Sequence, residues 1–63
     1  MSRFGEILKK YRENAQMSTS ELAEKSGISE YNITAFEDIG RSPEINELMS
    51  LSDALGIKSV ELL

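Results

Sequence analysis

The stretch Met17-Ser18-Thr19-Ser20-Glu21-Leu22-Ala23-Glu24-Lys25-Ser26-Gly27-Ile28-Ser29 decides the fold, because it marks both ends of a helix. Ser18 and Glu21 have the spacing of a capping box, in which each side chain accepts a hydrogen bond from the other residue's backbone amide. Met17, just before the cap, can pack on Leu22 as a hydrophobic staple. The sequence therefore predicts a helix that begins immediately after Ser18.

The same stretch predicts where that helix ends and where the next begins. Gly27 stands where a residue in the left-handed conformation would end the helix, and Ser29 can cap a third helix running to about Asp38. Two helices that cross steeply over so short a turn need a small residue where they touch, which Ala23 supplies. Ala23 or Gly27 alone would fit an ordinary corner between helices equally well. The full set favours a helix-turn-helix, with inward residues Leu22, Ile28, Ile33 and Phe36.

Apolar residues at helical spacing predict three further helices. A first helix covers residues 3–14, with a stripe of Phe4, Ile7, Leu8 and Tyr11. A fourth is capped by Ser42, has Pro43 at its first position and ends at Gly56. Its stripe is Ile45, Leu48, Leu51 and Leu55. Ser59 caps a last short helix, with Val60 and Leu63 facing inward. We therefore expect an all-α fold of five short helices, with residues 1–63 as a single domain.

Composition excludes several classes of function. The chain of 63 residues has no Cys and no His, so disulfides, a Cys/His zinc site and the usual acid–base residue of enzymes are missing. No glycine-rich phosphate loop or suitably spaced carboxylate pair appears. We expect no catalytic residues, no metal and no cofactor. No apolar run could span a membrane and no signal-peptide pattern opens the chain, which favours a soluble cytoplasmic protein.

From end to end the chain resembles the helix-turn-helix domains of the Cro and phage-repressor family, also called the XRE family. The matching segments are 4–13, 17–29, Phe36-Glu37, Pro43, 54–57 and 60–63. The resemblance implies a lambda-repressor-like DNA-binding domain, with the helix-turn-helix formed by helices two and three. It also implies that the protein regulates transcription by binding double-stranded operator DNA as a homodimer. Helix three would then lie in the major groove.

The resemblance also suggests which residues meet DNA. Thr19, in the first turn of helix two, could hold a phosphate with its hydroxyl and nearby amides. Tyr31 and Asn32 could offer hydrogen bonds to base edges, and Arg41 is the best-placed phosphate clamp. The full set that matches the family's DNA-facing places and their flanks is Thr19, Ser29, Glu30, Tyr31, Asn32, Thr34, Ala35 and Arg41.

The resemblance further suggests a buried ion pair between Arg12, on helix one, and Glu37, near the end of helix three. The alternative is that these are two surface charges with negligible coupling. The family commonly has a basic residue and then Gly after this Glu. Here Asp38 and Ile39 occupy those places, and the Gly comes one residue later, as Gly40.

Charge argues against strong DNA binding. The whole chain carries 7 − 11 = −4, although affinity for DNA rests largely on Lys and Arg at phosphates. Residues 18–41 hold two basic and five acidic side chains, giving 2 − 5 = −3. Glu30 at the groove entrance repels phosphate, although it can accept a hydrogen bond from cytosine N4.

A second function therefore stays open beside the DNA-binding regulator. The acidic helix three could face a basic protein partner on the same scaffold, with Tyr31 and Ile39 as exposed anchors. Either residue could instead be packed: Tyr31 partly against the surface, Ile39 in the core. If DNA is the target, we expect a dimer formed by the C-terminal end, around Ile57, Leu62 and Leu63.

Overall fold

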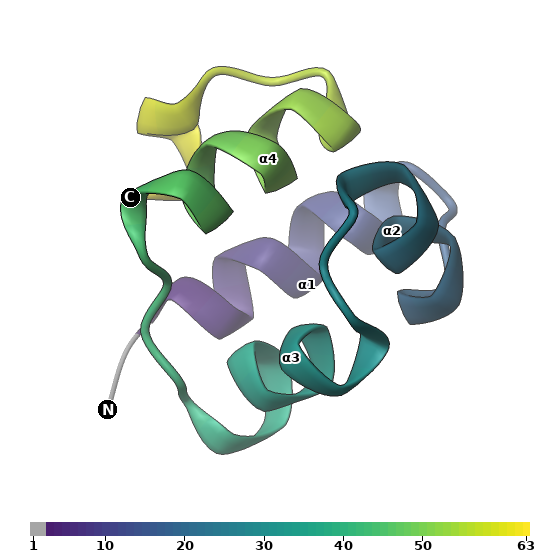
Figure 1. The fold of residues 1–63 in the computed structure, drawn as a ribbon. Helices are drawn as coiled ribbons and strands as arrows, with labels where there is room; N and C mark the ends of the chain where they lie inside the picture. The colour runs from purple at the N-terminus through teal and green to yellow at the C-terminus, as the bar shows by residue number, and fades with distance from the viewer. Residues whose placement is uncertain (1–2) are drawn as a thin grey trace.

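The computed structural model describes residues 3–63, and Figure 1 shows them as a bundle of short helices. The elements in chain order are α1 (Phe4–Asn14), α2 (Thr19–Ser26), α3 (Glu30–Thr34), the π-helical turn η1 (Ala35–Ile39), α4 (Ile45–Leu55) and the 3₁₀ turn η2 (Ser59–Leu62). The part of the chain described contains no strand, which confirms the all-α prediction. The fifth predicted helix is a single 3₁₀ turn.

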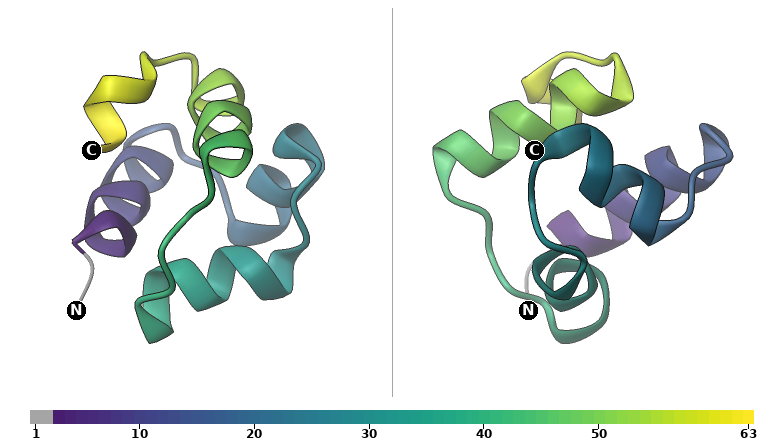
Figure 2. Two further views of the ribbon diagram at one scale, coloured as in Figure 1. Left: turned by 60° about the vertical axis from the view of Figure 1, so that its left-hand side comes forward. Right: turned by 45° about the vertical axis from the view of Figure 1, so that its right-hand side comes forward.

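The core is built from one or two apolar side chains per element. Leu8, Leu22, Ile33, Phe36, Leu51 and Leu62 are fully buried, and Phe4 and Leu48 nearly so. Phe4 and Phe36 meet edge to face, with ring centroids 5.3 Å apart and an interplanar angle of 89°, an arrangement that aromatic pairs prefer. In Figure 1, α1 runs through the middle, with α3 below it and α4 above it, and both views of Figure 2 also place α3 at the bottom.

The helix-turn-helix has the termini that its sequence predicts. The Ser18 hydroxyl accepts from the Glu21 amide at 3.0 Å, and the Glu21 carboxylate accepts from the Ser18 amide at 3.0 Å. Gly27 ends α2 at φ 77°, a left-handed conformation that a side chain disfavours. Ser29 caps α3 by accepting from the Asn32 amide at 3.2 Å.

The prediction for the start of α4 was wrong by two residues. Glu44, not Ser42, is the N-cap, and Ile45, not Pro43, is the first helical residue. The Glu47 carboxylate accepts from the Glu44 amide at 2.9 Å. This bond satisfies a donor at the helix start, so the Ser42-Pro43 pair belongs to the preceding loop.

The inward residues of the last segment were also predicted wrongly. Val60 and Leu63 are exposed, whereas Leu62 is fully buried. The backbone amide of Lys58 donates to the Glu61 carboxylate at 3.0 Å, so the N-cap of this turn is Lys58 and not Ser59. The Ser59 hydroxyl instead bonds that of Ser52 at 2.9 Å.

The π-helical turn η1 explains why Gly40 comes later than expected. The amides of Gly40 and Arg41 both bond the carbonyl of Ala35, the latter at 3.1 Å. A π turn holds one residue more than an α turn, so the helix continues through Ile39 before Gly40 ends it at φ 86°. None of the helices described is long and apolar enough to cross a membrane.

Candidate nucleic-acid interface

The starts of α2 and α3 are joined by a hydrogen bond between their side chains. The Thr19 hydroxyl donates to Oε2 of Glu30 at 2.8 Å. Each residue is the first of its helix, and both lie at the surface of the helix-turn-helix. The bond therefore fixes the Glu30 carboxylate relative to α2 as well as α3.

The first turn of α3 presents most of the expected DNA-facing side chains. Tyr31 is 79 % exposed, Ser29 and Glu30 are exposed, and Asn32 and Thr34 are partly so. Two of these hydroxyls already serve the helix: Ser29 is its cap, and Thr34 donates to the Glu30 carbonyl at 2.9 Å. Glu30, Tyr31 and Asn32 are left as the side chains with polar groups to offer.

Ala35 lies with the core residues. Only 6 % of it is exposed. It is the first residue of the π turn, and its carbonyl accepts hydrogen bonds from the amides of Gly40 and Arg41. Its methyl group therefore fills space behind the surface, and it does not join the other seven candidate residues there.

Arg41 is tied to the fold by two contacts. Its Nη1 lies 3.2 Å from both carboxylate oxygens of Glu47 on α4, and its guanidinium carbon sits 4.8 Å from the Phe36 ring centroid, within reach of a cation–π attraction. Within residues 3–63, its Nε and Nη2 donate no hydrogen bond, and the side chain is 36 % exposed, so these donors are open to a ligand.

Arg12 and Glu37 form a buried pair behind this surface. Nε of Arg12 lies 2.8 Å from Oε2 and Nη2 lies 2.9 Å from Oε1, with side chains only 11 % and 3 % exposed. Nη1 also donates to the Met17 carbonyl at 2.7 Å. The hydrogen bonds that Arg12 donates to the Glu37 carboxylate raise the pKa of Arg12 above its usual value, in spite of burial. The predicted pair is thus present, and it anchors the end of the α3–η1 helix to α1.

The family model described as a Cro/C1-type HTH DNA-binding domain matches residues 7–63. The chain belongs to the Cro/C1-type helix-turn-helix family.

A solved structure agrees with this assignment. The restriction-modification controller protein C.AhdI from Aeromonas hydrophila superposes on the Cro/C1-type domain with a TM-score of 0.91 and 28 % sequence identity, over 97 % of this chain and 92 % of that one. No curated protein sequence matches this chain significantly. The chain is therefore a DNA-binding domain of the type that regulates transcription.

Gly5 is a residue of the Cro/C1-type domain whose importance the sequence did not reveal. A Cβ atom there would collide with the Phe36 carbonyl oxygen and lie 3.0 Å from the Glu37 Cα. The absence of a side chain thus lets α1 touch the η1 backbone, which brings Arg12 and Glu37 within bonding distance. A glycine in the first turn of a helix gives no sequence signal for such a contact.

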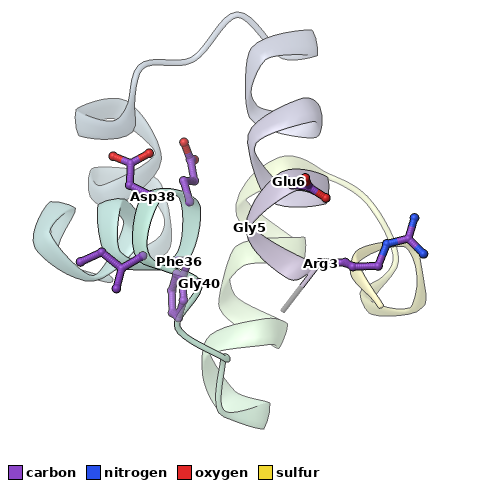
Figure 3. A pocket seen from close by; sticks show the side chains of 8 residues that line it. Arg3, Gly5, Glu6, Phe36, Asp38 and Gly40 are labelled. Carbon is purple, nitrogen blue, oxygen red and sulfur yellow. The ribbon is translucent and has the colours of Figure 1, made fainter. Parts of the chain in front are cut away.

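A hollow of about 240 Å³ opens beside this crossing, lined by residues from the start of α1 and from η1. Figure 3 shows Arg3 pointing away from it and Asp38 on its far side. Its lining residue Glu37 is already paired with Arg12. No group of three metal-binding side chains occurs among residues 3–63.

Proposed function

We propose that this Cro/C1-type domain is a sequence-specific transcriptional regulator that places α3 in the major groove of double-stranded DNA, acting in the cytoplasm. The observation that carries the proposal is the exposed first turn of α3, with Glu30, Tyr31 and Asn32 presenting polar groups. The N-terminal residues of a recognition helix are those that reach base edges. The backbone amides in the first turn of α2, at Thr19, and the open donors of Arg41 flank this turn and serve phosphates.

We further propose that the domain binds as a homodimer. Four exposed apolar side chains lie on its two C-terminal elements, two on α4 and two in or next to η2: Ile45, Met49, Val60 and Leu63. Ile45 and Met49 are one turn apart on the same face of α4. These four define the proposed dimer surface. Leu62, expected there from the sequence, is in the core, and Ile57 packs against it.

DNA affinity of a single copy should be low. Residues 18–41 carry −3, and the Arg41 guanidinium is already shared with Glu47. Since each phosphate contact made by a cation adds to the salt-dependent affinity, few such contacts give weak, salt-limited binding. Nanomolar binding by a monomer at physiological salt would contradict this.

The experiment is a titration of ¹⁵N-labelled domain with mixed-sequence duplex DNA at low salt, following backbone amide shifts. The proposal predicts shifts confined to Thr19, residues 29–34 and Arg41, reversed by added salt. If no amide shifts at protein concentrations that favour a dimer, the proposal fails. The exposed side chains of Tyr31 and Ile39 beside Asp38 and Glu30 would then favour a basic protein partner for the same helix.

A further inference from the structure

We infer that Glu30, held in position by Thr19, determines base specificity by selecting a cytosine in each DNA half-site. This inference rests on the proposed function and adds the identity of one base. It starts from a side-chain hydrogen bond that bridges the two helices of the motif, from Thr19 Oγ1 to Glu30 Oε2 at 2.8 Å.

The bond leaves one oxygen of the carboxylate available. Within residues 3–63, Thr19 is the only hydrogen-bond donor to the Glu30 carboxylate, so Oε1 keeps its full accepting capacity. The neighbouring hydroxyls of Ser29 and Thr34 are engaged with the helix backbone. Glu30, the first residue of α3, therefore presents a strong hydrogen-bond acceptor at the surface.

Base chemistry then restricts what Glu30 can accept from. An ionised carboxylate has no hydrogen to donate, so it repels the O6 and N7 acceptors of guanine and the O4 acceptor of thymine. Cytosine N4 and adenine N6 are the amino donors in the major groove, and adenine places its N7 acceptor beside N6. Cytosine has no such neighbouring acceptor, which makes it the favoured partner.

Thr19 makes this choice sharper by limiting the motion of a flexible side chain before DNA arrives. Glutamate loses rotamer freedom when it is fixed at an interface, and a side chain already fixed loses less on binding. Thr19 is thus a positioning residue, and its effect should appear as the strength of the cytosine preference, not as a change of preferred base.

Selection from a randomised duplex library, followed by sequencing, tests the role of Glu30. The wild-type domain should enrich cytosine at one position of each half-site. Glu30→Gln should move the preference at that position to adenine, because Gln pairs with adenine N6 and N7. The preference should change by about fivefold or more. Glu24→Gln removes the same charge from an exposed site on α2, so it should raise affinity without altering the preferred base.

Two variants and one modified base test the positioning. Thr19→Val removes the hydroxyl and should lower the cytosine preference severalfold, whereas Thr19→Ser should restore it. N4-methylcytosine at the selected position should weaken wild-type binding. The one hydrogen left on N4 of the modified base pairs with guanine. The methyl group therefore lies on the major-groove side of N4, where Glu30 would bind.

The outcomes separate the two proposals. If the wild-type domain enriches no sequence, the proposed function fails, and the inference that Glu30 selects a cytosine fails with it. If it enriches a motif in which Glu30→Gln and Thr19→Val change no base preference, only the present inference is overturned. Circular dichroism of each variant verifies that the fold is intact.

Discussion

Arg12 is the residue on which most of the motif's placement depends. Its guanidinium bonds both carboxylate oxygens of Glu37 and the Met17 carbonyl, so it joins α1, the turn before α2 and the end of the α3–η1 helix. Two parallel N–H to oxygen bonds also fix direction, which a lysine could not do.

Replacing Arg12 by Ala should reduce the free energy of unfolding by about 3–5 kcal/mol, because it leaves the Glu37 carboxylate buried without a partner. Chemical denaturation measures this loss. The double variant Arg12→Met/Glu37→Leu removes both charges together and should recover much of the stability. A loss below about 0.5 kcal/mol for Arg12→Ala, as for an exposed pair, would show that the pair contributes little.

Glu47 should give the stability of the domain a dependence on acid pH. The backbone amide of Glu44, more than the Arg41 side chain, holds the pKa of Glu47 below its ordinary value. A carboxyl whose pKa is lower in the folded state stabilises the fold at pH values above its ordinary pKa. That contribution is lost as pH falls from about 4.3, the ordinary glutamate pKa, through the lower pKa of the folded state.

Thermal unfolding measured between neutral pH and pH 3 checks this expectation. Glu47→Gln should reduce the fall in unfolding temperature over the acid part of that range. Glu24→Gln, on the exposed face of α2, should not. If the unfolding temperatures of wild type and Glu47→Gln fall equally with pH, Glu47 is not the cause of the acid dependence.

At the scale of elements, the contact between α1 and η1 depends on Gly5. Gly5→Ala should destabilise the domain by about 3 kcal/mol, at the upper end of the usual cost of overpacking, because the new methyl group meets backbone that cannot rotate away. Gly27→Ala is the matched control: nothing lies within 4 Å of the added Cβ. It should cost only the left-handed strain of about 1–2 kcal/mol. Urea denaturation compares the two, and a larger loss for Gly27→Ala would refute the crossing argument.

The elements also differ in how far their sequence predicted them. The bounds of α2 followed from Ser18, Glu21 and Gly27, because caps are local chemistry. The start of α4 did not, because Ser42-Pro43 imitates a helix start that Glu44 and Glu47 supply instead. The Arg12–Glu37 pair came from resemblance alone, since its partners are 25 residues apart. The Thr19–Glu30 bond and the exposure of Val60 depend on how helices pack, which local spacing does not encode.

At the scale of the whole molecule, the domain measures 25 × 23 × 21 Å. Half-sites one helical turn apart have centres about 34 Å apart, so one copy this small covers one half-site and a symmetric pair is needed for two. The proposed dimer surface of Ile45, Met49, Val60 and Leu63 would bring the two copies together.

The variant Met49→Gln/Leu63→Gln should shift the domain toward monomer and weaken its binding to a two-half-site duplex by tenfold or more, since two apolar anchors are lost per copy. Sedimentation equilibrium and a binding titration measure the two effects. Ile39→Gln is the control: Ile39 is 74 % exposed but lies on η1, outside the proposed surface. Unchanged self-association in the double variant would exclude this surface.

The π turn η1 has a consequence for how the length of this chain can vary. A π turn holds one residue more than an α turn, so an extra residue is taken up within the helix and does not lengthen the loop to α4. Ile39 is the removable residue, because its side chain is exposed while the buried Ile33 and Phe36 precede it. Deleting it should turn η1 into a regular α-helical turn and leave the core in register, so the chain can lose one residue at this position and keep the same fold.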